Sequence, residues 1–476
     1  MSEELSRSED SRQTAKTAVL NTIANGIALV VGMVMVPIIA RIISQEELGI
    51  ASTFLANRNI FVIVITLAVY SYVHKAMLEF RDEKKNYIFS VSVFCVAMTG
   101  LAFLVCLPFK SRLQALLSMD DFLYYWLFLS ILSFALYNIA YYYCVFHNKY
   151  IIVFAIVMSV GPLSQFVSVF LAHVMSDRKY IGRVIGLDSL YVIVAVCLIV
   201  WLLVSGKKSF RGKYLSGTLR FTVPVIPHLL SQMVLTQCDL IMISYYCGDD
   251  KSGIYSMGHT VGYLALTAVL QLMASWSPWV YRRLEGKETD SIKQNSGLMV
   301  LLGAYLSIGL MTVAPELIRI FLPKEYLPCI YILPPLIAAM FFQFIYLFFY
   351  DLEYYYKKPV WIATASVIAA VLNLILNKIF IVRYGYVAAC YTTFVSYFVL
   401  LAVSWLFAGR LNAAKIYNLK SMVAAIAGVV IYMILMFVFS DIIWVRYMLL
   451  VALSAVIFIR EKNRLLGLWR GMRSGV

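Results

Sequence analysis

Long apolar runs joined by short basic segments restrict the possible folds of this chain more than any other feature. A transmembrane helix needs about twenty apolar residues to cross the hydrocarbon core of a bilayer. About fourteen runs meet that requirement, over residues 18–40, 52–73, 87–108, 122–145, 151–174, 181–204, 220–246, 254–281, 297–314, 328–350, 360–380, 386–408, 421–439 and 442–459. Since 62% of the residues are hydrophobic and only 14% are charged, a water-soluble fold could not cover these runs. We therefore expect an all-α, multi-pass membrane protein with about fourteen transmembrane helices.

The placement of Lys and Arg predicts the orientation, because cytoplasmic loops of membrane proteins carry an excess of both. With the amino end inside, about 27 of the 40 basic residues fall in cytoplasmic segments and about 11 in outer segments. This alternation supports an even number of crossings, with both termini in the cytoplasm. The first apolar run is long and lacks a small-residue cleavage site, so we interpret it as a transmembrane helix rather than a signal peptide.

Two similar segments indicate an internal repeat. Residues 47–52 read ELGIAS and residues 251–256 read KSGIYS, and both form the outer turn that enters an even-numbered span. A duplication of six spans would place the match there, and because six is even the two copies share one orientation. We expect two six-helix lobes facing each other across a cavity, followed by two additional helices. The boundaries are a cytoplasmic tail at 1–17, an N-terminal lobe at 18–204, a cytoplasmic linker at 205–219, a C-terminal lobe at 220–408, the additional helices at 421–459 and a basic cytoplasmic tail at 460–476.

Several function classes are excluded by what the sequence lacks or by where its charges lie. The net charge of +15 is spread over short loops and builds no basic face with interleaved aromatics, so we expect no nucleic-acid partner. The eight cysteines show neither a CxxC pair nor metal-ligand spacing, so we expect no metal and no cofactor. Since no nucleotide-binding loop, HExxH, GxSxG or paired-carboxylate motif occurs in a loop, we expect no catalytic residues and no enzyme.

Several short segments carry a resemblance to a known family. Residues 37–41 read PIIAR and are followed by EELG at 46–49, and residues 221–228 read FTVPVIPH, with Asp239 near the outer end of the same span. Three further pieces are SWSPWVY at 275–281, PE at 315–316 with LPKEY at 322–326, and NLILN at 373–377 with YG at 384–385 and AA at 388–389. In this order, the segments resemble those of the polysaccharide exporters and O-antigen flippases of the multidrug, oligosaccharidyl-lipid and polysaccharide exporter superfamily.

The resemblance implies a V-shaped fold of two lobes that works by alternating access in a bacterial plasma membrane. It also implies a substrate, an undecaprenyl-pyrophosphate-linked oligosaccharide moved outward for O-antigen, capsule or a related surface polysaccharide. A polysaccharide polymerase and chain-length machinery are then expected as partners. The basic, amphipathic tail at 460–476 predicts contact with anionic membrane lipids.

Charged side chains inside the spans are the candidate functional residues. Each costs about 2.5–3.5 kcal/mol on insertion scales, so each needs a partner or a wet cavity. A pyrophosphate crossing the bilayer needs fixed cations along its path. The candidate substrate-binding residues are Arg58, Arg183 and His228 inside the spans and Arg41 at the rim. The alternative for the arginines is an ion pair with Asp188 or Asp239 that only joins helices, and the alternative for His228 is a helix-packing hydrogen bond.

Two acidic residues and three prolines complete the set of candidate functional residues. Asp188 and Asp239 are candidates either for coupling transport to an ion gradient or for those ion pairs. Pro37, Pro224 and Pro227 interrupt helices and free backbone carbonyls, which suits a hinge that lets one lobe rock or, alternatively, a static kink.

Two other functions compete with a flippase. A cation-coupled multidrug exporter of the same superfamily needs a buried carboxylate that responds to the gradient, and Asp188 or Asp239 meets that need. Such exporters usually have twelve spans, however, and the polysaccharide-type segments favour the flippase. A membrane enzyme, such as a polysaccharide polymerase or a glycosyltransferase, usually carries a sizeable outer loop with catalytic charges, whereas the outer connections here are at most about fifteen residues long.

Overall fold

The computed structural model describes residues 20, 23–24, 26–80, 82–205 and 209–455, and these are almost entirely helical. The tails predicted at 1–17 and 460–476 lie outside the described residues. Eleven described helices are long and apolar enough to cross a membrane. Helix α11 and two shorter apolar helices, Gly26–Ile42 and Ile443–Ala455, occupy the remaining three predicted spans. The all-helical, multi-pass fold expected from the sequence is therefore confirmed.

The first bundle contains the helices that precede the linker. They are the first helix (Gly26–Ile42), α2 (Gln45–Thr66), α3 (Val73–Glu79), α4 (Lys84–Cys106), α5 (Lys110–Leu117), α6 (Asp121–Phe146), α7 (Tyr150–Met158), α8 (Ser164–Val174) and α9 (Lys179–Val204). A π-helical turn, Ser159–Leu163, joins α7 to α8 and contains Pro162. Side chains cap the starts of two of these helices: Ser44 accepts a hydrogen bond from the backbone of Glu47 at 3.2 Å, and Asp120 accepts one from Leu123 at 2.8 Å.

The second bundle contains the remaining helices. They are α10 (Gly212–Cys247), α11 (Asp249–Glu285), α12 (Thr289–Phe321), α13 (Cys329–Tyr355), α14 (Pro359–Tyr384), α15 (Ala388–Gly409), the short α16 (Ala413–Ile416), α17 (Leu419–Phe439) and the last described helix, Ile443–Ala455. Helix α13 lies at the centre, with 89% of its apolar window buried. Since α13 has so little contact with lipid, polar groups on it must find partners inside the protein.

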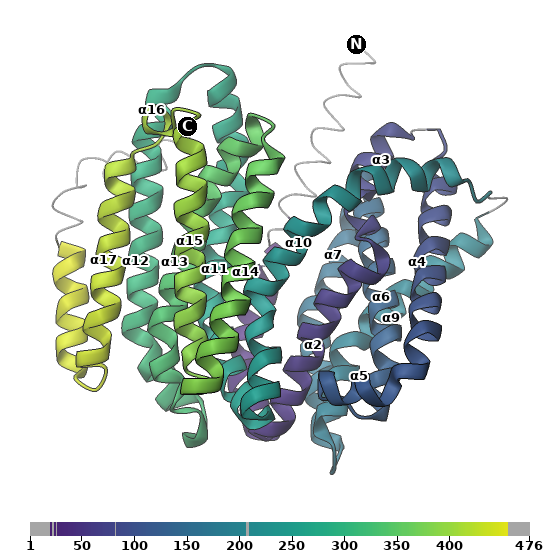
Figure 1. The fold of residues 1–476 in the computed structure, drawn as a ribbon, viewed down its shortest axis with the longest axis horizontal. Helices are drawn as coiled ribbons and strands as arrows, with labels where there is room; N and C mark the ends of the chain where they lie inside the picture. Colours follow the sequence, from purple (N-terminus) through teal and green to yellow (C-terminus); the bar gives the residue numbers. More distant parts are fainter. Residues whose placement is uncertain (1–19, 21–22, 25, 81, 206–208, 456–476) are drawn as a thin grey trace.

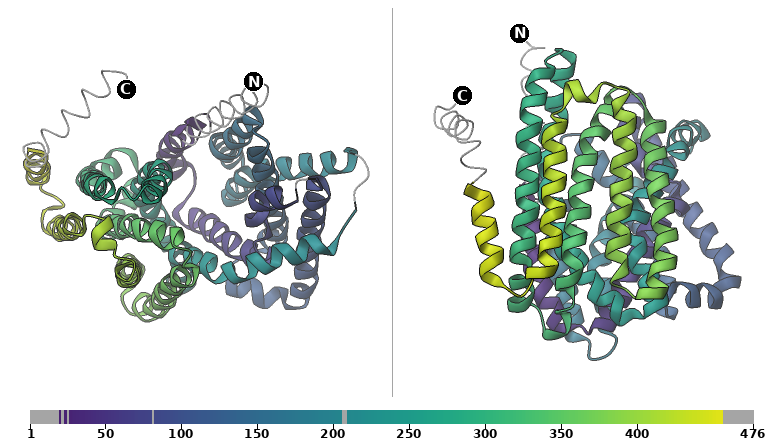
Figure 2. Two further views of the ribbon diagram at one scale, coloured as in Figure 1. Left: turned by 90° about the horizontal axis from the view of Figure 1, so that it is seen from above. Right: turned by 60° about the vertical axis from the view of Figure 1, so that its left-hand side comes forward.

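The two bundles form a V (Figure 1). They meet at the lower end of that view and spread apart toward the upper end, where α3 and α16 lie. Helix α10 starts beside the first bundle at the top and runs diagonally toward the junction, so it packs against α2 and α4 as well as α14. Seen along the helices, the two groups stand side by side, with α17 and the last helix at one edge of the second (Figure 2).

The repeat found in the sequence lies at the junction of the V. Helices α2 and α11 cross at Gly49 and Gly253, the central glycines of the two matching segments. A Cβ atom on Gly49 would come within 1.8 Å of the carbonyl oxygen of Asp249, and one on Gly253 within 1.9 Å of the carbonyl oxygen of Gln45. Only glycine permits so close an approach of two helix backbones. Thr53 and Ser252 add a hydrogen bond of 3.2 Å beside this crossing.

The linker predicted at 205–219 is largely helical, because α10 begins at Gly212. Tyr214 and Thr218 are buried on this extension, and the Tyr87 and Thr218 hydroxyls lie 3.2 Å apart. Glu83 accepts hydrogen bonds from Lys213 at 2.6 Å and from Arg211 at 2.7 Å. The start of α10 is thus fastened to the start of α4 at the end that the charge distribution places in the cytoplasm.

Candidate functional site between the two bundles

A cavity of about 220 Å3 lies between the bundles, close to their junction. Its walls come from the first helix, α2, α8 and α9 on one side and from α11 on the other. Most of the lining is apolar. The polar side chains that face it are Ser52, Gln165, Arg183, Ser256 and Thr260.

Arg183 supplies the positive charge in this cavity. Its Nη1 donates to Gln165 Oε1 and to Ser168 Oγ, both at 2.9 Å. Within the described part of the chain, no carboxylate forms a salt bridge with it. Since its hydrogen-bond partners are neutral, the full positive charge of Arg183 remains available to an anion.

Close packing of α8 and α9 places Arg183 there. Added Cβ atoms on Gly182 and Gly186 would lie 2.7 Å from the backbone of Ala172 and 2.2 Å from the Cα of Ser168, so the two helices touch backbone to backbone. This contact brings Ser168 and Gln165 within reach of the guanidinium one turn away.

Arg58 is arranged differently, because it forms a salt bridge with Asp188. Both side chains are buried, and Asp188 also accepts hydrogen bonds from Ser130 Oγ at 2.6 Å and from Trp126 Nε1 at 3.1 Å. The guanidinium lies 5.1 Å from the centre of the Phe134 ring. The pair joins α2 to α9 inside the first bundle, which is the helix-joining arrangement considered from the sequence.

Asp239 lies in the second bundle and has no cation partner among the described residues. It accepts hydrogen bonds from Tyr255 Oη at 2.7 Å, Asn377 Nδ2 at 2.6 Å and Thr393 Oγ1 at 2.5 Å. These donors come from α11, α14 and α15, while Asp239 itself is on α10. Four helices therefore meet at one buried carboxylate whose hydrogen-bond donors are all uncharged.

The other predicted site residues are scattered. His228 Nδ1 lies 2.9 Å from Ser366 Oγ, and the ring stacks on Tyr350 with 6.2 Å between centres. Arg41 is exposed near the junction, and its guanidinium lies 3.5 Å from the carbonyl oxygen of Phe321.

The three prolines lie inside helices. Pro37 is in the first helix, and Pro224 and Pro227 are inside α10, which remains helical through both. Ser231 Oγ donates to the carbonyl oxygen of Pro227 at 2.6 Å.

Three buried charged groups were not singled out from the sequence. Arg446, in the last described helix, forms a salt bridge with Glu316 of α12 and donates to the carbonyl oxygen of Thr312 at 2.5 Å. Asp351 accepts hydrogen bonds from Ser277 at 2.7 Å and Tyr281 at 3.1 Å. Glu353 is fully buried, and its carboxylate oxygens have no hydrogen-bond partner among the residues that the structure describes. Asp351 and Glu353 would have been found if the span predicted at 328–350 had been extended to Tyr355, where α13 ends.

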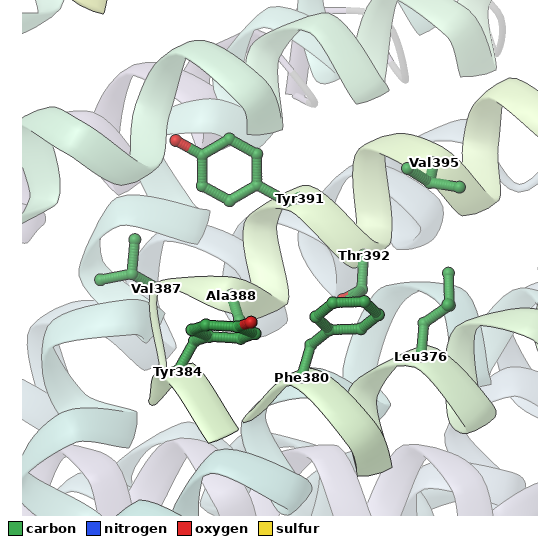
Figure 3. Close-up of a pocket in the computed structure, with 8 residues that line it drawn as sticks. All are labelled: Leu376, Phe380, Tyr384, Val387, Ala388, Tyr391, Thr392 and Val395. Carbon is green, nitrogen blue, oxygen red and sulfur yellow. The ribbon is translucent and has the colours of Figure 1, made fainter. Parts of the chain in front are cut away.

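An apolar groove of about 500 Å3 lies between α14 and α15 near their outer ends (Figure 3). The rings of Phe380 and Tyr384 stack along one wall, with 5.9 Å between centres. Thr392 lines the groove and donates to Asn377 of the Asp239 network. In the described part of the chain, no three His, Cys, Asp or Glu side chains gather in a way that could hold a metal ion.

The fold and the cavity define a class: a multi-pass membrane protein built like two-bundle transporters. Within that class, the chain belongs to the polysaccharide biosynthesis protein family, whose model matches residues 14–283, more than half of the sequence. No curated protein matches the sequence.

Solved structures share the fold. The lipid II flippase MurJ in an inward closed conformation is 15% identical, with a TM-score of 0.72 over 94% of this chain and 100% of that chain. An inward-facing multidrug resistance MATE family transporter is 12% identical, with a TM-score of 0.58 over 84% of this chain and 95% of that chain. A MATE transporter from Vibrio cholerae is 13% identical, with a TM-score of 0.52 over 85% and 98% of the two chains.

Proposed function

We propose that this protein is a flippase that moves an undecaprenyl-pyrophosphate-linked oligosaccharide repeat unit from the inner to the outer leaflet of a bacterial plasma membrane. The product would serve O-antigen, capsule or a related surface polysaccharide. The single observation that carries the proposal is Arg183, an arginine that has no carboxylate partner among the described residues and lines a cavity between the two bundles. Membership of a polysaccharide biosynthesis family and the flippase-like fold support it.

The shape of the V supports alternating access. The bundles touch at the end that the basic loops place outside, where Gln45 Nε2 donates to the carbonyl oxygen of Glu325 at 2.7 Å and Gly49 contacts Gly253. They separate at the opposite end, so the pyrophosphate would enter from the cytoplasm and meet Arg183. Opening the outer contacts then releases the sugar outward. Arg41 sits at this outer contact and is proposed to bind the phosphates on exit.

The remaining predicted residues take supporting parts in this proposal. Arg58 holds α2 on α9 through Asp188, and its direct binding of substrate stays a prediction. His228, partly buried beside the cleft, is proposed to contact sugar. Pro224 and Pro227 lie inside α10, which packs against helices of both bundles, and they are proposed to act as a hinge.

Asp239 is proposed as the coupling residue. Asp188 already has the cation of Arg58 beside it, whereas Asp239 is buried among uncharged donors. A buried carboxylate among uncharged donors is stable when it binds a proton or a cation. The fraction of Asp239 that holds such an ion can therefore follow an ion gradient.

We further propose that the chain moves its substrate without modifying it, and that both termini face the cytoplasm. A polysaccharide polymerase and chain-length machinery would use the flipped product. Anionic membrane lipids would contact the basic tail at 460–476.

A clean deletion tests the function. Undecaprenyl-linked repeat units should accumulate facing the cytoplasm and surface polysaccharide should disappear. The wild-type gene should restore both, and Arg183→Gln should not, although the variant protein is inserted. Arg183→Lys should restore export partly, because the ammonium keeps the positive charge but cannot form the paired hydrogen bonds of a guanidinium. Normal polysaccharide in the deletion strain would refute the proposal.

A cation-coupled multidrug exporter is the second candidate, because Asp239 has no cation partner among the described residues and MATE transporters share the fold. It predicts that Asp239→Asn raises drug sensitivity while surface polysaccharide stays normal. The flippase proposal predicts loss of polysaccharide with drug sensitivity unchanged.

A further inference from the structure

Five polar atoms of four almost fully buried side chains on α13 and α15 have no hydrogen-bond partner in the described protein. They are Tyr346 Oη and both carboxylate oxygens of Glu353 on α13, and Tyr397 Oη and Ser404 Oγ on α15. The four side chains are between 0% and 2% exposed. Most buried polar groups in proteins are bonded, so five unbonded atoms on two neighbouring helices point to an additional ligand between them.

Helical spacing puts these atoms in one column. Tyr346 and Glu353 are seven residues apart on α13, and Tyr397 and Ser404 are seven apart on α15, so each pair shares a helix face. Helices α13 and α15 pack closely along their lengths and both run from the outer end to the cytoplasmic end. Ordered by depth, the column descends from Tyr397 through Tyr346 and Ser404 to Glu353, which is two residues from the end of α13.

The upper end of the column meets the Asp239 network. Thr393, which donates to Asp239, is one helical turn before Tyr397 on α15. Tyr397 follows Thr393 by four residues on α15, and Tyr346 precedes Glu353 by seven residues on α13. The Tyr397 hydroxyl lies near Tyr263 of α11 but makes no hydrogen bond of acceptable geometry with it. Polar side chains on α13 and α15 therefore extend from the Asp239 network toward Glu353.

We propose that Tyr397, Tyr346, Ser404 and Glu353 line a narrow hydrated path that carries protons between Asp239 and the cytoplasm. The proposal rests on the proposed function and deepens it, because it makes the proton the coupling ion. Water suits the column, since a buried water needs two to four polar partners and hydroxyl and carboxylate oxygens supply them. Chains of such groups are the usual proton relays of membrane proteins.

Proton balance along the path is simple. Asp239 binds one proton from the outer side while the V is open outward. The proton then moves over water and the tyrosine hydroxyls to a Glu353 oxygen, and it leaves from there to the cytoplasm. Each carboxyl is neutral while it holds the proton, which avoids an unpaired buried charge.

The groups around Glu353 contain no competing cation in the described structure. From α10, His228 stacks on Tyr350, one turn before Glu353, and from α14 the His228 partner is Ser366. Asp351 on α13 already bonds to Ser277 and Tyr281 of α11.

Other neighbours lie farther along the same helices. His259 on α11 stacks on Tyr263, with 4.5 Å between ring centres. Tyr417, after α16, contacts Phe348 and Phe349 of α13. Lys357 and Lys358, just past α13, are exposed and form no salt bridge with Glu353.

Infrared difference spectroscopy of the full-length protein in phosphatidylethanolamine and phosphatidylglycerol vesicles tests this path. A pH jump should reveal a protonated carboxyl band that Glu353→Gln removes. After transfer to D2O, the deuterium shift of that band should slow about tenfold in Tyr346→Phe and in Tyr397→Phe, since each removes one link of the relay. Tyr124→Phe is the matched control, because this buried hydroxyl also lacks a partner but lies in the first bundle.

The outcomes separate this proposal from the flippase proposal. An unchanged set of carboxyl bands in Glu353→Gln, or exchange in both tyrosine variants as fast as in Tyr124→Phe, would overturn the proton path. In cells, Glu353→Gln should lose export while Tyr124→Phe keeps it. If the deletion loses polysaccharide but Glu353→Gln exports normally, the proton path is refuted and the flippase proposal is not. Normal polysaccharide in the deletion strain would instead refute the flippase proposal.

Discussion

Gly49 lies where the two bundles touch at the junction of the V, and Gly49→Ala should separate them there. The added Cβ would lie 1.8 Å from the Asp249 carbonyl oxygen, whereas carbon and oxygen normally approach to about 3.3–3.6 Å. The two backbones must then separate by about 1.5 Å at a point where no flexible side chain can move aside. Overpacking of this kind costs about 1–3 kcal/mol. A free-energy cost of that size lowers the population in which this junction is closed, relative to the population in which it is open, by about 5- to 150-fold.

Labelling of a cysteine at Ser252 measures the opening. Ser252 is fully buried at the junction, where its hydroxyl bonds to Thr53. In a background without native cysteines, Ser252→Cys should react with a membrane-impermeant maleimide about 5- to 150-fold faster when Gly49→Ala is present. Gly100→Ala in α4 is the control, since its Cβ would meet nothing within 4 Å and it makes the same change in helix propensity. Equal labelling rates in Gly49→Ala and Gly100→Ala would refute the reasoning.

Two further predictions concern ion pairs. Arg58→Ala strands the buried Asp188 carboxylate, so we expect a loss of about 3–5 kcal/mol, measured as thermal unfolding in detergent. Arg58→Met combined with Asp188→Leu should recover most of that loss, and equal instability of the single and double variants would contradict the role of the pair. Hydrogen bonds from Lys213 and Tyr214 lower the pKa of Glu83 from 4.5 to about 2. Because the folded pKa is the lower one, this contact contributes fully above pH 4.5 and is lost as the pH falls toward 2. Amide exchange at the start of α10, corrected for intrinsic rates, should rise over that range in wild type, whereas Glu83→Gln should show no such pH dependence.

The bilayer explains why so much of the fold follows from sequence. Hydrocarbon satisfies no backbone hydrogen bonds, so each long apolar run must be a helix, and the basic loops predict the orientation. The repeat was also visible, because Gly49 and Gly253 must be glycines for two backbones to touch. The start of α10 was misplaced by eight residues, since a hydropathy window does not register an amphipathic extension that packs on α4.

The site was harder to predict, since pairing depends on how each helix is rotated. Arg58 and Asp188 were both recognised, but 130 positions separate them and hydropathy does not show that they face each other. Arg446 lies within the span predicted at 442–459 but was not among the candidate residues, although it is buried against Glu316. Glu353 was missed for a different reason, because the predicted span stopped before the last turn of α13.

Flipping by the purified protein tests the central claim most directly. The protein is reconstituted into vesicles with a fluorescent undecaprenyl-pyrophosphate-linked oligosaccharide, and an impermeant quencher reports the label in the outer leaflet. With a proton gradient of suitable sign, label from the inner leaflet should become quenchable in wild-type and Gly100→Ala vesicles. Arg183→Gln vesicles should match protein-free ones. Wild-type vesicles that also match protein-free ones, under gradients of either sign, would contradict the account.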